Sequence, residues 1–293
     1  MLSSSPEDED HDFVEFAQKA ELEEGYCKLT VYENPMIDEA TRNRLMDECG
    51  GPESSTWLRE YMCKRVIDSS KAIVAEWKDE YVQDVPRDEF YRFYHKYEAM
   101  DLGVRDNTAI LFGYYDFMKA KLIIEDEWIM NGPTLTTETI RRAINEKEKN
   151  LFGNLRVYSR ISDNNNPLLL QDLSLGDSPI YFSPTDKSRL EEMVNHLKIL
   201  VRNGGLIVHP RCKNLIGCLR TGIWDNHRDK FAQSKVYGHY DALAALIYMV
   251  RNLDRSTNPI PVDYNLDRDN QLLFVKARQT DGAEQLKRAF NMT

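Results

Sequence analysis

Two long runs of strand-forming residues, joined by a very short connection, constrain the fold of this chain more than any other feature. Residues 108–117 (TAILFGYYDF) and 121–130 (KLIIEDEWIM) are rich in β-branched and aromatic residues, and three residues separate them. This spacing predicts a β-hairpin. Helical and short strand-like patterns then alternate as far as residue 252. The whole order predicts an α/β fold in which helices flank a mixed sheet.

The boundaries of the expected helices are marked by capping residues and glycines. Downstream of the hairpin, capping residues, terminal glycines and helical spacing of apolar residues predict helices at 136–153, 186–205, 212–222 and 238–252. Short buried strands are expected at 155–159 and 206–209. Upstream, residues 35–51 predict a helix that starts near Asp38 and stops at Gly50 and Gly51. A second upstream helix is expected at 54–68, capped by Ser54 or Ser55.

Three aspartates lie at the edges of three different expected elements. Asp101 ends the stretch 97–101, Asp163 follows the strand 155–159, and Asp241 opens the apolar helix 238–252. In a chain with 48 acidic residues, the ordinary interpretation of each is a solvated charge or a helix cap. Asp241 fits that interpretation least well, because a helix that is apolar almost all round is buried and a buried charge needs a partner or a metal. Carboxylates from separate elements are also the hard oxygen ligands that pairs of Mg²⁺ ions use in cleaving phosphodiesters.

Composition and charge exclude several classes of protein. The net charge of −10 argues against a protein that coats nucleic acid non-specifically, yet ten basic and only four acidic residues lie between Lys187 and Lys235. Such a segment indicates either a surface for phosphates or a mixed helix surface. No run approaches the roughly 18 apolar residues of a membrane span, and the polar, acidic start MLSSSPEDEDHD is unlike a signal or transit peptide. The five cysteines form no CxxC, so we expect reduced thiols in a cytoplasmic protein.

Four segments resemble, in the same order, the RNase H-like nuclease domain of the large terminase subunit of tailed bacteriophages. Residues 100–117 (MDLGVRDNTAILFGYYDF) resemble its first motif, and residues 162–173 (SDNNNPLLLQDL) resemble the second, an acid followed by a polar, Pro-containing loop. Residues 207–225 (IVHPRCKNLIGCLRTGIWD) resemble the segment between the second and third acids. Residues 238–253 (GHYDALAALIYMVRNL) resemble the third motif. The resemblance implies an RNase H-like mixed sheet flanked by helices, preceded by a small, mostly helical segment.

The upstream residues resemble a different part of the same family, the tail of the packaging ATPase domain, through LTVYENPMID and GGPESSTWLREYMCKRVIDSSKAIV. The chain has no GxxxxGK[ST] phosphate-binding loop, so ATP hydrolysis by this chain alone is not expected. The domains implied are a C-terminal remnant of the ATPase domain (1–85), a linker (86–96), the nuclease domain (97–262) and a C-terminal tail (263–293). Such a chain begins late in a terminase, through truncation or a split gene.

The activity implied by the resemblance is metal-dependent endonucleolytic cutting of concatemeric double-stranded viral DNA during genome packaging. The catalytic residues and ligands of two Mg²⁺ or Mn²⁺ ions would be Asp101, Asp163 and Asp241. His239 would be auxiliary, because it stands two residues before Asp241 where relatives often have a histidine three before. Asp106 could be a second auxiliary residue, although a turn residue is the preferred interpretation.

The remaining implications concern partners and alternatives. The DNA backbone would be contacted by Lys187, Arg211 and Lys213. The partners implied are double-stranded DNA, the portal protein, the small terminase subunit and an ATPase-containing chain or other terminase copies. The location would be the host cytoplasm, transiently at the procapsid portal, with no membrane. Two alternatives stay open: a non-catalytic packaging-motor fragment that docks to the portal or to an ATPase partner, and another RNase H-like nuclease such as a junction resolvase.

Two further patterns carry structural expectations. Strand alternation would place Glu125 and Glu127 on one face of the sheet and Asp126 on the other, where they form either an extra metal contact or a solvated surface. The aromatic residues at 90, 91, 93 and 94 are expected to pack as part of a linker, with stacking on bases as the alternative.

Overall fold

The fold is taken from a computed structural model of the chain, which describes residues 27, 29–64, 71–103, 107–131, 135–176, 178–225, 228–234 and 237–261. The chain divides into two compact units, residues 1–255 and 256–293. The expectations for residues 1–12, for the tail 263–293 and for Asp106 fall outside the described residues.

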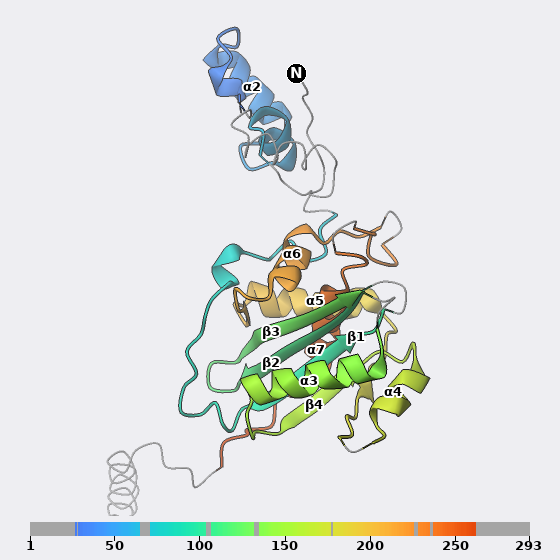
Figure 1. The fold of residues 1–293 in the computed structure, drawn as a ribbon. Coiled ribbons are helices and arrows are strands. Elements are labelled where there is room, and N and C mark those ends of the chain that lie inside the picture. The colour runs from blue at the N-terminus through green and yellow to red at the C-terminus, as the bar shows by residue number, and fades with distance from the viewer. Residues whose placement is uncertain are drawn as a thin grey trace, which may run out of the picture. The chain divides into compact units, whose positions relative to one another are not determined.

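A mixed six-stranded sheet forms the centre of the first unit, in the order β5-β4-β1-β2-β3-β6 (Figure 1). Its strands are β1 (His95–Asp101), β2 (Asn107–Asp116), β3 (Lys121–Asn131), β4 (Val157–Ser162), β5 (Ser183–Pro184) and β6 (Leu206–Val208). β2 is antiparallel to both of its neighbours, whereas β1 with β4, β4 with β5 and β3 with β6 are parallel. Five strands therefore run in one direction, and their carboxyl ends point toward the same edge of the sheet.

The expected hairpin is confirmed, and it contains an irregularity. β2 and β3 pair from Asn107–Asn131 to Asp116–Lys121, with a register shift between Phe112 and Gly113. A side chain at Gly113 would bring its Cβ to 2.5 Å from the carbonyl oxygen of Ile123. The backbone of β3 thus lies close to Gly113 at the bulge, and glycine permits that approach.

Helices cover both faces of the sheet. α5 (Leu190–Arg202), α6 (Lys213–Thr221) and α7 (Asp241–Arg251) lie on one face, and α3 (Thr137–Leu151) lies on the other (Figure 1). The main hydrophobic core fills the space between the sheet and the first three helices. Nine of the eleven residues of α7 are buried, which explains why its sequence is apolar almost all round.

A short helix replaces the loop expected after Asp163. α4 (Pro167–Leu173) begins with a proline at its first position, and Oδ1 of Asn166 accepts a hydrogen bond from the backbone N–H of Leu169. Proline at the first helical position costs no hydrogen bond, because that N–H has no partner within a helix. The asparagine supplies the cap. The polar, Pro-containing sequence is therefore the start of a helix rather than an extended loop.

Residues 29–64 contain short helical elements: η1 (Val31–Glu33), α2 (Glu39–Glu48) and η2 (Trp57–Tyr61). The helix expected near Asp38 is confirmed, because Oδ1 of Asp38 accepts a hydrogen bond from the backbone N–H of Thr41. Gly50 follows this helix with φ of 91°, a conformation that glycine adopts without strain. Of the two candidate caps for the next element, Ser54 is the one that accepts a backbone hydrogen bond, from Trp57.

The segment between residues 71 and 94, which includes η3 (Asp79–Tyr81), packs against the sheet and its helices. Ile73 and Val74 belong to the main core, and Val82 forms a parallel bridge with Val208 of β6. Tyr94 is buried and stacks on Tyr114 of β2, with ring centroids 5.9 Å apart. The preferred interpretation of this aromatic segment, packing against the domain, is therefore confirmed for its buried tyrosines.

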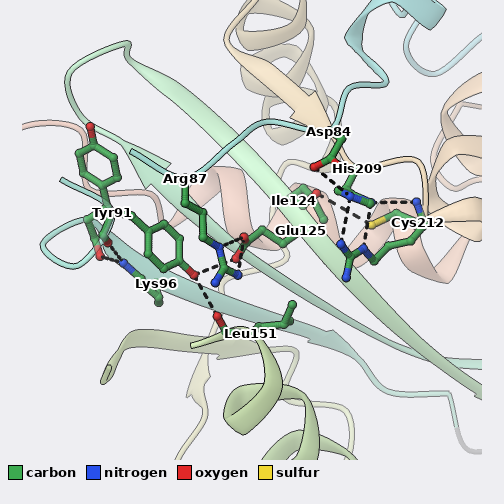
Figure 2. A network of polar contacts seen from close by, with 11 residues as sticks. Asp84, Arg87, Tyr91, Lys96, Ile124, Glu125, Leu151, His209 and Cys212 are labelled. Carbon is green, nitrogen blue, oxygen red and sulfur yellow. Dashed lines mark hydrogen bonds and ion pairs between the residues drawn. The ribbon is translucent and has the colours of Figure 1, made fainter. Parts of the chain in front are cut away.

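The expected placement of the acidic residues of β3 is wrong. Tyr91 donates hydrogen bonds to Glu125 and to the carbonyl of α3's last residue, so Glu125 lies on the α3 face (Figure 2). Asp126 pairs with Lys147 of α3 and lies on the same face. Glu127 instead accepts two backbone N–H groups in the first turn of α6, on the opposite face. The bulge inserts one residue into the strand, which breaks strict alternation at this point.

Candidate functional site

The parallel pairing of β1 and β4 places two aspartates side by side. The last pair in register is Met100 with Ser162, and an aspartate comes next on each side: Asp101 is the last residue of β1, and Asp163 directly follows β4. Neighbouring strands lie about 4.8 Å apart, and residues in register point to the same face. Because both strands end here, the two carboxylates stand at the carboxyl edge of the sheet, on the side covered by α7.

The third aspartate reaches the same edge from a helix. Asp241 is the first residue of α7, which packs against β1, β2 and β4. The chain turns sharply before it, with positive φ at Gly238 and at Tyr240. A Cβ at Gly238 would lie 2.8 Å from Oδ2 of Asp241 and 3.4 Å from Nδ2 of Asn107. The absence of a side chain at Gly238 therefore makes space for the carboxylate of Asp241. The N-terminus of α7 favours the negative charge of this carboxylate.

Two further side chains complete the cluster. The hydroxyl of Tyr248 donates a hydrogen bond of 3.2 Å to Oδ1 of Asp101. The ammonium group of Lys187 pairs with Oδ2 of Asp163 and lies 5.5 Å from the centre of the Tyr248 ring. Sequence reasoning missed Tyr248, although it stands two helical turns after Asp241 and therefore on the same face of α7.

The neighbouring carboxylates and burial both act on the pKa of Asp101. Burial, together with the negative charges of Asp163 and Asp241, raises the pKa of Asp101 to about 7. The Lys187 ammonium and the hydrogen bond from Tyr248 act in the opposite direction. Burial also raises the pKa of Tyr248 far above its usual value, so its hydroxyl stays protonated and remains a donor.

The site has the donors for a hard cation, but its side chains do not surround one. Asp163 is fully buried, and among the described residues its Oδ1 has no hydrogen-bond partner. Within those residues, no group of three or more His, Cys, Asp or Glu side chains could hold a metal ion as it stands. The chemistry of the donors and the orphaned oxygen fit a divalent ion. The carboxylates would have to draw together around it.

The structure separates the remaining candidate residues. Lys187 lies inside the acidic cluster, whereas Arg211 and Lys213 follow β6, which is three strands away from β1 in the sheet. Three strand spacings place β6 itself about 14 Å from β1. Arg211 instead donates a hydrogen bond of 2.9 Å to Nδ1 of His209. His239 lies in the turn immediately before α7, one residue from Tyr240.

The sheet, its helices and the position of its acidic edge define an α/β fold of the RNase H-like class. No protein-family model matches the chain, and no curated protein sequence matches it. A structure of the large terminase from a thermophilic bacteriophage has this fold, with a TM-score of 0.51 and 15% identity. The match covers 85% of this chain and 61% of that one. The expected likeness to large terminases of bacteriophages is therefore confirmed at the level of the fold.

Two further similar structures are also of phage large terminases or their nuclease domain. One is the large terminase of the same thermophilic phage in complex with ADP, with 15% identity and a TM-score of 0.51. That match covers 85% of this chain and 60% of the other. The other is the large terminase nuclease domain of bacteriophage P22, at 14% identity and a TM-score of 0.47, with 61% of this chain and 90% of that one covered. This chain spans about three fifths of the length of the thermophilic phage's large terminase. Among the described helices, none is long and apolar enough to cross a membrane.

Proposed function

We propose that this chain is the nuclease part of a large terminase and cuts double-stranded DNA in a metal-dependent reaction during packaging of a viral genome. The fold supports this proposal, since the arrangement of its sheet and helices is similar to that of a large terminase. The observation that carries the proposal is the convergence of Asp101, Asp163 and Asp241 at one edge of the sheet, from the ends of β1 and β4 and from the start of α7.

The proposed chemistry assigns a role to each group of the cluster. Asp101, Asp163 and Asp241 would hold two divalent ions, Mg²⁺ or Mn²⁺, through carboxylate oxygens. The chemistry that ions bound there would supply is activation of a water molecule as the nucleophile and neutralisation of the charge on the leaving 3′ oxygen. Tyr248 orients the carboxylate of Asp101 through its hydrogen bond. No covalent bond between protein and DNA is required.

The proposal also covers the domains of the chain, its DNA contacts and its partners. Residues 1–85 would be the remnant of an ATPase domain, 86–96 a linker, 97–262 the nuclease domain and 263–293 a tail, with the part of the remnant from residue 71 onward packed against the nuclease domain. Arg211 and Lys213, exposed and outside the acidic cluster, would contact the DNA backbone, where phosphate binding without base contacts positions the duplex. The partners would be the portal protein, the small terminase subunit and an ATPase-containing chain or other terminase copies, with action in the host cytoplasm at the procapsid portal.

The proposal is tested by plasmid nicking with the purified chain in Mn²⁺, Mg²⁺ or EDTA. Wild type is compared with Asp101→Ala and Asp241→Ala, and with Asp47→Ala as a control, because Asp47 is an exposed residue of α2. We expect cleavage in metal, none in EDTA, and none with either site variant. Circular dichroism of the variants establishes that their fold is intact.

Three outcomes would contradict the assignment. Nicking at the wild-type rate by either folded site variant would show that the acidic cluster is not the active centre. Absence of cleavage in both metals, even after an ATPase-containing terminase chain is added, would favour a non-catalytic docking role. Preferential cutting of branched over linear DNA would instead favour a junction resolvase.

A further inference from the structure

A lysine occupies the acidic cluster, at the carboxylate that is most deeply buried. The side chain of Asp163 is completely inaccessible to solvent, and one of its oxygens pairs with the ammonium group of Lys187. Its other oxygen has no hydrogen-bond partner among the described residues. A buried carboxylate without a compensating charge is strongly unfavourable, so Lys187 supplies much of the compensation that Asp163 receives.

The backbone that carries Lys187 is fixed, but its side chain is not enclosed. On either side of it, Asp186 pairs with Arg251 at 2.9 Å and the carbonyl of Ser188 accepts a hydrogen bond from the same guanidinium group. Nδ2 of Asn252 donates to Oγ1 of Thr185 at 2.8 Å. These contacts hold the segment against the end of α7.

The side chain of Lys187 itself is 37% exposed. A four-carbon stem on a fixed backbone can swing its charge out of the cluster without any change in the fold. The ring of Tyr248, 5.5 Å from the ammonium group, adds a cation–π contact that the lysine keeps only while it points inward. Its inward and outward positions thus differ by one ion pair and one aromatic contact.

We propose that Lys187 is a built-in counter-ion of the acidic cluster, which occupies Asp163 when no divalent ion is bound and leaves when one binds. This inference rests on the proposed function and adds its regulation, since the lysine competes with the metal for Asp163 and so sets the metal affinity. Lys187 is then a positioning residue. Once displaced, its ammonium group is available to a DNA phosphate, which reconciles the observed ion pair with the DNA contact expected from the sequence.

Binding of Mn²⁺ to the full chain tests the inference without measuring cleavage. Free Mn²⁺ is followed by electron paramagnetic resonance during titration of wild type, Lys187→Met and Lys187→Arg. Lys149→Met is the control, because Lys149 is an exposed lysine on α3. We expect Lys187→Met to bind Mn²⁺ on the order of tenfold more tightly than wild type, because it removes the competitor. Lys187→Arg and Lys149→Met should resemble wild type.

Thermal unfolding supplies a second measurement. In EDTA, Lys187→Met should have a lower Tm than wild type, because Asp163 loses its counter-ion, and Mn²⁺ should raise the Tm of this variant more than that of wild type. Should Lys187→Met not fold, Lys187→Gln serves in the same comparison.

The outcomes separate the two hypotheses. Equal Mn²⁺ affinity in wild type and in the neutral variant, with binding lost in Asp163→Asn, would overturn the counter-ion role and leave the metal site standing. Absence of Mn²⁺ binding in every variant would overturn the metal site, and the counter-ion role with it. Tighter Mn²⁺ binding by Lys187→Met, with Lys187→Arg and Lys149→Met unchanged, supports both the metal site and the counter-ion role.

Discussion

The hydroxyl of Tyr248 donates a hydrogen bond of 3.2 Å to Oδ1 of Asp101, and this contact links the middle of α7 to the carboxyl end of β1. Asp241, two helical turns earlier on α7, belongs to the same cluster. One helix therefore contributes an acidic residue of the cluster and the group that orients another. The contact also ties the geometry of the candidate site directly to the packing of α7 on the sheet.

Removing this hydroxyl should reduce activity without unfolding the protein. We expect Tyr248→Phe to keep the ring packed in the core and to lower the rate of Mn²⁺-dependent plasmid nicking by about tenfold, because hydrogen bonds to charged groups contribute about 1.5–3 kcal/mol. The concentration of Mn²⁺ that gives half the maximal rate should rise as well, which a purely structural role would not cause. Tyr32→Phe, at an exposed position, is the control. An unchanged rate and metal dependence would restrict Tyr248 to a packing role.

The buried lysine of β1 should impose a pH dependence on stability. Lys96 is 1% exposed, its ammonium group donates to the carbonyls of Tyr91 and Tyr94, and burial lowers its pKa to about 8 (Figure 2). Between pH 8 and 10.5 the unfolded chain retains this proton while the folded protein has released it. The free energy of unfolding contributed by this group therefore rises with pH across that window.

The comparison that isolates this effect is urea unfolding of wild type and Lys96→Met at pH 7.5, 8.5 and 9.5. Relative to the variant, wild type should gain stability as the pH rises, by about 3 kcal/mol at most over the whole window. Parallel pH profiles for the two proteins would show that Lys96 keeps an ordinary pKa in the folded state.

A single arginine of α3 holds the end of α4 and the residues that follow it. The guanidinium group of Arg141 donates to four carbonyl oxygens, those of Asp172, Leu173, Leu175 and Ser178. Arg141→Ala should lower the free energy of unfolding by about 1–2 kcal/mol, because several of these acceptors lose their charged donor. Limited proteolysis should become faster between residues 172 and 178. Arg142→Ala, at an exposed position on the same helix, should change neither.

The N-terminus of α6 is capped from a strand rather than from its own sequence. Cys212 precedes this helix without a side-chain cap, and Glu127 of β3 accepts the backbone N–H groups of Asn214 and Leu215 at 2.7 and 2.8 Å. Glu127→Ala should destabilise the protein by about 1–2 kcal/mol, as loss of a helix cap does. Amide hydrogen exchange in α6 should accelerate, and Glu127→Gln should restore part of the protection. Unaltered exchange in the alanine variant would contradict the capping role.

Local patterns were sufficient for most of the secondary structure. The hairpin of β2 and β3 follows from two strand-like runs and a short connection, and apolar spacing predicts the presence of α3, α5 and α7. The helices α5 and α7 begin a few residues later than expected, without a side-chain cap. These features depend on residues within a few positions of one another. Local alternation failed at Glu125, because the bulge in the pairing of β3 with β2 puts Glu125 and Asp126 on the same face of the sheet.

The sequence by itself determined the α/β class of this protein, the order of its main elements and the identity of three aspartates placed at element ends, because each of these is written in short-range periodicity and capping. The tertiary structure alone decided which side chains meet. Parallel pairing of β1 with β4 set Asp101 beside Asp163, and packing between distant segments brought Tyr248 and Lys187 to them. Strand register, bulges and long-range ion pairs depend on the relative placement of segments far apart in the chain, and no local pattern specifies that placement.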